Sequence, residues 1–255
     1  MSDIYRDGSY ISLNPSLHEE DSDYKFKYIS TLLREISFGT AAIRVLDIGG
    51  GAGVIAAKVC HELAGGRPGR VECHALDLSP EALALQRKNN PYCTLATSDA
   101  EEIRKAGGYD LTLLIDVIEH IPLNGETASM VDQISHHAIY NIPTEINLVD
   151  LLRNAYMRGR YYPGQEASLG HIHFFSASSA KAFVSRHHRR LRRAIFPDFA
   201  AHSLESPAPN YVRQRANRLM LLELKISRWI AAYLRPLAPH IVQGSLFMLA
   251  ECRRA

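Results

Sequence analysis

Acidic residues and glycines gather where the first apolar segment of this chain ends. Residues 45–48 are apolar except for Asp47, and the glycine turn 49–53 follows them directly. A helical pattern begins at Val54, so backbone N–H groups and the positive end of a helix dipole border the turn. Because glycine has no Cβ, the backbone there can lie flat against a ligand. Such a turn can hold a nucleotide-like ligand.

Two ligands compete for this turn. Residues 51–56 read Gly-Ala-Gly-Val-Ile-Ala, which fits the G-x-G-x-x-A fingerprint of dinucleotide sites. Asp47 favours S-adenosylmethionine (SAM) instead, because the methionine end of SAM carries an ammonium and a sulfonium. A dehydrogenase strand is normally apolar at this position. In a second interpretation, the Asp47 carboxylate only accepts hydrogen bonds from the glycine turn.

Strand and helix patterns alternate over the first 145 residues. Strands are predicted at 44–49, 70–77, 93–97, 109–115 and 137–142, and helices at 53–64, 80–89, 99–106 and 125–135. An earlier helix is predicted from Asp21 or Ser22 to about Ser37, after a turn-rich stretch over residues 1–20. This alternation predicts an α/β fold with a mostly parallel sheet and helices on both faces.

The pattern changes after Pro143. A helix is predicted at 146–158, turn chemistry at 160–164, an extended segment at 170–175 and a helix from Ser176. A strand fits 190–196, a helix fits 211–234 and a closing strand fits 245–251. The second half is therefore expected to add two strands and several helices to the alternating core.

Four motifs follow one another along the chain. They are residues 45–53, 75–79 (Ala-Leu-Asp-Leu-Ser), 96–100 (Ala-Thr-Ser-Asp-Ala) and 114–122 (Leu-Ile-Asp-Val-Ile-Glu-His-Ile-Pro). Their order and spacing resemble those of class I SAM-dependent methyltransferases of the bacterial small-molecule type. The resemblance covers residues 40–145 strongly, and 170–185 and the last strand more loosely. It implies a Rossmann-like, seven-stranded sheet whose last strand, 245–251, is antiparallel.

The resemblance also implies how the chain is divided. Residues 1–40 would form an N-terminal lid and helix, and 41–145 the SAM-binding core. Residues 146–255 would complete the same domain, with insertions at 146–175 and 205–240 that form a helical cover over the acceptor.

The resemblance assigns a role to the residue at the end of each strand. Asp77 would accept hydrogen bonds from the ribose diol and Asp99 from the adenine amino group, while Asp116 would border the methionine moiety. Asp99 could instead cap the next helix, and Asp77 could be a solvent-facing acid. The expected cofactor contacts are Asp47, Gly49, Gly51, Gly53, Asp77, Leu78, Asp99, Ala100 and Asp116.

Methyl transfer by in-line displacement requires alignment of the reactants, exclusion of water and, for some acceptors, a base. His171 and His173 are the expected catalytic residues, because histidine titrates near neutral pH and alternation around Ile172 puts both on one face of an extended segment. Either histidine could instead pack against, or cap, the helix from Ser176. His18 is a further candidate in the N-terminal lid.

A divalent metal ion is an alternative to a protein base alone. Asp116, Glu119 and His120, with His171 or His173, would offer oxygen and nitrogen ligands to a hard ion. The pattern is similar to the E-x-x-E-H motif of metal-dependent O-methyltransferases that act on ribose ends of small RNA, and of related ubiquinone-pathway enzymes. Here the first acid is Asp, which shortens its reach, and metal-free relatives also carry Glu-His at this place. The main interpretation therefore assigns no metal ligand.

The composition is that of an ordinary globular chain. Its 255 residues are 46% hydrophobic and 22% charged, and the formal net charge of +2 requires no nucleic-acid or anionic-membrane partner. Four cysteines without C-x-x-C spacing indicate buried free thiols and a cytoplasmic location, in line with a polar N-terminus and no apolar run long enough for a membrane span.

Two segments could still meet a macromolecular partner. The basic run 189–193 is expected to be a solvated edge rather than a nucleic-acid site. The apolar helix around 219–230 is expected to be a lid over the acceptor or a dimer face, so a homodimer is left open. We therefore expect a SAM-dependent methyltransferase that modifies an oxygen or nitrogen of a small molecule. The alternative from another class is a non-catalytic SAM-binding partner subunit.

Overall fold

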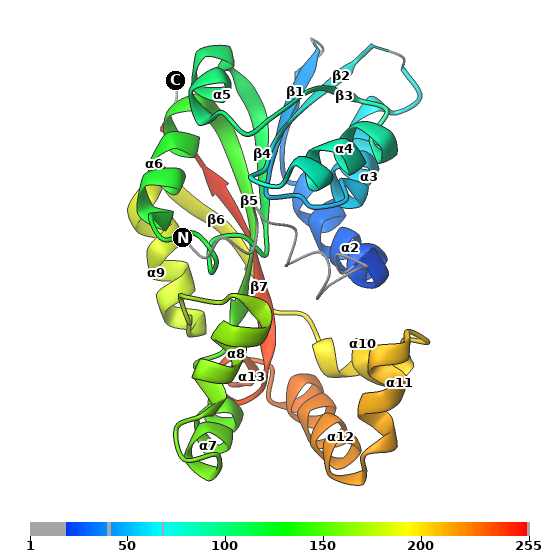
Figure 1. Ribbon diagram of the computed structural model, residues 1–255, viewed down its shortest axis with the longest axis vertical. Helices are drawn as coiled ribbons and strands as arrows, with labels where there is room; N and C mark the ends of the chain where they lie inside the picture. Colours follow the sequence, from blue (N-terminus) through cyan, green and yellow to red (C-terminus); the bar gives the residue numbers. More distant parts are fainter. Residues whose placement is uncertain (1–18, 40–41, 68, 254–255) are drawn as a thin grey trace.

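A seven-stranded sheet with helices on both faces forms the centre of the molecule (Figure 1). The computed structural model describes residues 19–39, 42–67 and 69–253, so His18 and most of the expected N-terminal lid lie outside the described residues. The strands are β1 (Ile43–Ile48), β2 (Val71–Leu76), β3 (Cys93–Thr97), β4 (Tyr109–Ile115), β5 (Ser135–Thr144), β6 (Arg190–Ile195) and β7 (Gly244–Glu251).

The strand order is β3-β2-β1-β4-β5-β7-β6, which confirms the expected Rossmann-like topology. Strands β1 to β5 pair in parallel, whereas β7 pairs antiparallel with both β5 and β6. The predicted antiparallel last strand is therefore confirmed. The order in which successive strands are added to the sheet reverses beside β1. Strands β2 and β3 lie on one side of β1, and β4 and β5 lie on the other. Ligands of open α/β sheets bind at the carboxyl ends of the strands beside this point.

Thirteen helical segments accompany the sheet within the described residues. They are η2 (Glu19–Asp21), α2 (Ser22–Leu33), α3 (Val54–Ala64), α4 (Pro80–Asn89), α5 (Ala100–Ala106), α6 (Asn124–Ile134), α7 (Leu148–Tyr156), α8 (Tyr161–Leu169), α9 (Ala177–His187), α10 (Phe199–Glu205), α11 (Pro209–Ala216), α12 (Arg218–Tyr233) and α13 (Ala238–Ile241). Helices α2 and α3 lie on one face of the sheet, and α6 and α9 lie on the other (Figure 1).

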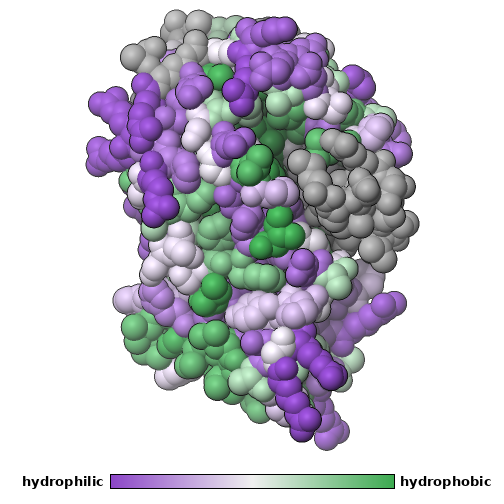
Figure 2. All heavy atoms as spheres, turned by 60° about the vertical axis from the view of Figure 1, so that its left-hand side comes forward, coloured by the Kyte–Doolittle hydropathy of each residue, from purple (hydrophilic) through white to green (hydrophobic). Residues whose placement is uncertain are grey.

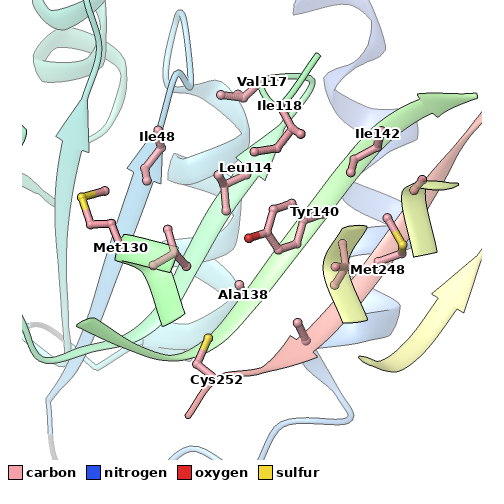
Figure 3. Close-up of a cluster of buried hydrophobic side chains, with 14 of the residues drawn as sticks. Ile48, Leu114, Val117, Ile118, Met130, Ala138, Tyr140, Ile142, Met248 and Cys252 are labelled. Carbon is pink, nitrogen blue, oxygen red and sulfur yellow. The ribbon is translucent and has the colours of Figure 1, made fainter. Parts of the chain in front are cut away.

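Successive strand residues fill two separate cores, because side chains of a strand alternate between the faces of the sheet. Leu114 packs with Tyr140, Met130 and Met248 on the α6–α9 face (Figure 3). Its neighbour Leu113 packs on the opposite face with residues of α2 and α3. Burial on both faces explains why these strands read as nearly continuous apolar runs in the sequence.

Two of the predicted helix boundaries were wrong in the second half. Residues 160–164 were expected to form a turn, but helix α8 begins at Tyr161 and includes Pro163. Proline is tolerated in the first turn of a helix, where the missing N–H would have no partner in any case. The single helix expected at 211–234 is divided into α11 and α12 at Asn217, whose side chain accepts hydrogen bonds from Leu219 N and Met220 N and caps α12.

The basic run and the cysteines lie where the sequence places them. Arg190 and Arg193 are exposed on β6, an edge strand, and Arg193 pairs with Glu35 at 3.7 Å. The basic run thus lies on an exposed edge, and the absence of a nucleic-acid partner stays a prediction. All four cysteines, which are among the described residues, are free; three are buried and Cys93 is half-buried.

Candidate functional site

The glycine turn after β1 has the backbone conformation that its sequence requires. Gly49, Gly51 and Gly53 have φ angles of +64°, +53° and +76°, a region that residues with a Cβ rarely adopt. Gly53 is the N-cap of α3. A Cβ on Gly49 would also lie 2.9 Å from a methyl carbon of Val117, so the turn packs closely against the end of β4. The turn is therefore preformed, with the amino end of α3 beside it.

Asp47 lies beneath this turn. Its side chain is buried, and Gln86 Nε2 donates a hydrogen bond of 2.8 Å to Asp47 Oδ2. A Cβ on Gly50 would overlap the same carboxylate. Burial raises the pKa of Asp47 to about 6, although the hydrogen bond from Gln86 acts in the opposite direction. The carboxylate thus lies against Gly50 and accepts from Gln86, and both interpretations of Asp47 stay predictions.

Asp77 and Leu78 follow β2, next to the turn. Asp77 Oδ1 accepts a hydrogen bond of 2.9 Å from Ser79 N, and the backbone amides of Gly51 and Leu78 also favour its charged form. Burial nevertheless raises the pKa of Asp77 above its usual value. Asp77 is half-buried rather than a solvent-facing acid, and Leu78 is exposed beside it. A ribose diol bound here would cover the part of the Asp77 carboxylate that is still exposed.

Asp99 and Ala100 are exposed where β3 passes into α5. Asp99 is the N-cap of α5, and its Oδ1 accepts a hydrogen bond of 2.8 Å from Glu101 N. The capping role is therefore present. The adenine contact expected for this residue stays a prediction.

Asp116 ends β4 in a strained conformation. Its φ of +56° is uncommon for a residue other than glycine, and such outliers occur mainly at functional sites. Lys25 Nζ of α2 lies 2.6 Å from Asp116 Oδ2, and Asn141 Nδ2 of β5 donates to Asp116 Oδ1. Burial alone would lower the pKa of Lys25, but its contact with Asp116 raises the pKa overall. The Asp116 carboxylate is therefore held by side chains of α2 and β5. No local sequence pattern predicts that these two elements meet at Asp116.

Glu119, His120 and His171 meet just beyond Asp116. Each offers one ligand atom, and the three atoms lie within 4.8 Å of one another. Glu119 is fully buried, and neither of its carboxylate oxygens has a hydrogen-bond partner among the described residues. Burial raises the pKa of Glu119 well above its usual value, and the charge of Asp116 raises it further. The nearest ion-pair partner of Glu119 among the described residues is His120, whose Nε2 lies 3.9 Å from Oε1.

Backbone hydrogen bonds connect the loop that carries His171 to the segment after β4. Ile172 N and His173 N both donate to Glu119 O, at 2.9 and 3.0 Å, and His120 Nδ1 lies 3.1 Å from Gly170 O. His171 and His120 then meet edge to face, with ring centroids 4.8 Å apart. This contact spans about fifty residues of sequence.

The two expected catalytic histidines have different partners. His171 is 8% exposed, and its Nδ1 lies 2.9 Å from Oε2 of Glu145, which is 3% exposed and directly follows β5. His173 Nε2 instead lies 3.0 Å from the backbone oxygen of Ile121, an arrangement that anchors the loop. Of the two, His171 therefore has the surroundings of a general base, with a carboxylate that orients it.

Three residues of this site were missed at the sequence level: Lys25, Gln86 and Glu145. Two of them left a signal. Lys25 lies at helical spacing from Ser22 and Ile29, which are buried, so a charge is placed on the inner face of α2. Glu145 follows the fifth strand as the aspartates follow the earlier ones. Gln86 gives no comparable sign, because a glutamine in a helix is ordinarily exposed.

Comparisons with known proteins concern the domain type and the fold. Residues 46–138 match a family model described as a methyltransferase domain. No curated protein matches significantly.

Among solved structures, the chain is similar to a phosphoethanolamine N-methyltransferase from Haemonchus contortus, with a TM-score of 0.52 and 15% identity over 87% of this chain and 51% of that one. It is also similar to a cyclopropane synthase from Mycobacterium tuberculosis (TM-score 0.54, 13% identity, 83% and 79% covered). A third is the magnesium protoporphyrin IX methyltransferase from Synechocystis (TM-score 0.53, 11% identity, 92% and 83% covered). The chain thus spans about half the length of the first and about four fifths of the others.

These structures share the seven-stranded fold, and the family match covers the glycine turn and the ends of β1 to β4. Residues 46–138 therefore match a methyltransferase domain, and the fold around them is the one that the similar structures share.

Proposed function

We propose that this chain transfers a methyl group to an oxygen or nitrogen of a small-molecule acceptor, with His171 as the general base. The observation that carries the proposal is the hydrogen bond between His171 and Glu145, both buried, beside the carboxyl ends of β4 and β5. Burial of a carboxylate or an imidazolium alone is costly, so the buried pair of Glu145 and His171 indicates that the two side chains act together.

The residues around the glycine turn fit SAM. The turn packs so closely against Val117 and Asp47 that a Cβ on Gly49 or Gly50 would overlap them, which keeps the turn in its preformed shape. Asp77 would hold the ribose diol, Asp99 and Ala100 the adenine, and the segment from Asp47 to Gly53 the methionine end. When bound, SAM supplies an already activated methyl group, so the protein has mainly to align the acceptor and exclude water.

His171 would remove the acceptor proton. A hydrogen bond from Nδ1–H to the Glu145 carboxylate fixes the tautomer in which Nε2 carries the lone pair. The Glu145 carboxylate would also stabilise the imidazolium that forms when Nε2 takes the proton. Glu145 is thus a positioning residue, and the catalytic group is His171.

A small acceptor is supported by the surface and by the similar structures. The exposed arginines of β6 lie on an edge strand away from the glycine turn, so they form no basic rim around the site. The Haemonchus structure contains phosphomonomethylethanolamine, and the Synechocystis protein is named for magnesium protoporphyrin IX. Both are small molecules, although their target atoms differ.

The test is formation of S-adenosylhomocysteine (SAH) from SAM with a panel of alcohols, phenols and amines, followed by mass spectrometry of the methylated product. His171→Gln should lower kcat by roughly 10²–10⁴-fold, the range typical of a general base. His173→Gln, which leaves the proposed base in place, should retain most activity. Tight SAM binding without SAH formation from any acceptor would favour the non-catalytic partner subunit instead.

Metal-assisted O-methylation is a second candidate, supported by the buried carboxylate of Glu119, whose oxygens accept no hydrogen bond among the described residues. Glu119, His120 and His171 offer one oxygen and two nitrogen ligands within 4.8 Å, a set that fits a divalent ion. Asp116 does not join them, because it pairs with Lys25 and Asn141. A bound ion would supply Lewis-acid stabilisation of an acceptor oxygen, and the three side chains would hold it.

Metal dependence separates the two candidates. Calorimetry of the SAH-bound protein with Mg²⁺ or Mn²⁺ should show binding that Glu119→Gln weakens at least tenfold. Full activity in excess chelator, together with no measurable ion binding, would leave the metal-free base as the mechanism.

A further inference from the structure

Helix α7 exposes its apolar side and buries its polar side. Asp150 is fully buried and pairs with Arg153 at 2.5 Å. The outward residues recur at helical spacing, and each is between 48% and 90% exposed: Leu148, Leu151, Leu152 and Tyr156. An amphipathic helix of a globular protein normally faces the other way. The exposed apolar side of α7 therefore requires an apolar partner that the described residues do not supply.

Helix α12 also exposes apolar side chains, along a face that runs over four turns. Leu224, on the opposite side of the helix, is buried. A straight outward stripe is formed by side chains that are between 51% and 78% exposed: Leu219, Leu222, Ile226, Trp229 and Tyr233. Their spacing of three, four, three and four residues keeps all five on one face. Tryptophan and tyrosine are the residues that favour a membrane–water interface.

The two helices lie at the same end of the molecule. Arg153 of α7 and Glu223 of α12 form an ion pair of 2.5 Å. Both helices lie at the lower end in Figure 1, beyond the carboxyl ends of β4 and β5. Figure 2, turned about the same vertical axis, shows apolar side chains gathered at that end with polar ones beside them. We call this surface, the outward faces of α7 and α12, the apolar end.

The segment that holds α11 and α12 carries an excess of positive charge. Residues 209–237 include six arginines and lysines but one acid, in a chain whose net charge is only +2. Arg218 and Lys225 are exposed along one edge of the α12 stripe. Two copies of this surface would bring like charges together, whereas anionic headgroups would neutralise them. Apolar stripes flanked by basic residues are typical of helices that lie in a membrane interface.

We propose that the apolar end docks on an anionic lipid surface, with α7 and α12 lying in the interface plane. No helix of the described residues is long and apolar enough to cross a membrane. The leucines and Trp229 would enter the acyl boundary, and Arg218 and Lys225 would contact lipid phosphates. The inference rests on exposure and charge, so it stands whether or not His171 is the catalytic base.

Trp229 makes the proposal directly measurable, because it is the only tryptophan of the chain. The full-length protein is mixed with vesicles of phosphatidylcholine alone or with about one third phosphatidylglycerol, and tryptophan emission and co-sedimentation are recorded. We expect a blue shift and sedimentation with the anionic vesicles, and weaker binding as salt rises.

Matched variants identify the surface. Leu152→Ser and Leu222→Ser together should weaken binding at least tenfold, and Arg218→Gln with Lys225→Gln should do the same on anionic vesicles only. Leu123→Ser is the control, because Leu123 and Leu152 are both 61% exposed but Leu123 precedes α6, away from the apolar end. Circular dichroism confirms that each variant is folded.

Three results would overturn the proposal. The first is an unchanged emission spectrum with anionic vesicles, and the second is equal vesicle binding by all variants. The third is a dimer in solution that Leu152→Ser and Leu222→Ser convert to a monomer, without any vesicle binding by the parent protein. That last result would assign the apolar end to a second copy of this chain.

Discussion

Burial of Asp47 beneath the glycine turn opposes the stability of the ligand-free protein above about pH 6. The folded-state pKa is raised from 3.8 to about 6, so the folded state holds its proton more tightly than the unfolded chain. The resulting stabilisation is complete below pH 3.8 and is lost as the pH rises through about 6. Asp47→Asn removes this cost while keeping an acceptor for Gln86. The variant should therefore gain about 1–3 kcal/mol in the free energy of unfolding at pH 8.

Urea unfolding of the ligand-free protein at pH 8 and at pH 3.5 measures this effect. The gain should be nearly absent at the lower pH, where Asp47 is neutral in the folded state and mostly neutral in the unfolded chain. Asp23→Asn is a suitable control, because Asp23 is exposed and its pairing with Lys58 contributes little. A variant that is less stable than the parent at pH 8 would show that the charged form of Asp47 supports the turn.

Glu145 orients the proposed base without touching the acceptor. Glu145→Gln keeps an oxygen that can accept from Nδ1 of His171 but removes the negative charge that stabilises the imidazolium. We expect kcat to fall roughly 10²-fold, the lower end of what a general base contributes. The affinity for SAM should not change, because Glu145 lies outside the glycine turn. Equal losses in kcat and SAM affinity would indicate a structural defect instead.

At the scale of single elements, two glycines should respond oppositely to the same substitution. Gly53 has a φ of +76°, and a Cβ there would overlap Gln86 Oε1, so Gly53→Ala should destabilise the protein by more than about 1 kcal/mol. Gly164 lies in α8 with nothing within 4 Å of an added Cβ. Gly164→Ala should therefore stabilise by about 0.4–1 kcal/mol. Thermal unfolding of both variants checks the pair, and a stabilising Gly53→Ala would contradict the packing at the turn.

The sequence is informative about elements wherever one local signal dominates. Strands buried on both faces read as apolar runs, and Ser79 and Pro80 mark the start of α4, so the core was predictable almost strand by strand. The helix predictions at Pro163 and Asn217 were wrong because each residue type is common in two kinds of local structure. Proline belongs to turns and also to the first turn of a helix, and Asn217 both interrupts one helix and caps the next. Which of the two structures forms depends on packing that a local pattern does not contain.

At the scale of the whole molecule, the site depends on contacts between distant segments. The strand-end acids were predictable, because parallel strands bring their carboxyl ends to one edge of the sheet. The sequence offered His171 or His173 as the partner of Glu119 in the metal alternative, but the choice between them depends on a loop whose backbone bonds to the segment after β4. The pairing of Lys25 with Asp116 depends in the same way on where α2 packs. Sequence reasoning therefore supplied the candidate residues, and the tertiary structure selected among them.

Because α3, β2 and β4 all border the glycine turn, a ligand bound there should stabilise the molecule as a unit. SAH at one hundred times its dissociation constant should raise the free energy of unfolding by about 2.7 kcal/mol, provided that it does not bind the unfolded chain. Asp77→Ala should weaken SAH binding by about 1–3 kcal/mol, since the ribose diol would lose its acceptor. The shift in melting temperature at a fixed SAH concentration should fall accordingly. A nicotinamide dinucleotide is the control, because the G-x-G-x-x-A match alone would favour it. A larger shift with the dinucleotide than with SAH would show that the glycine turn serves the other ligand.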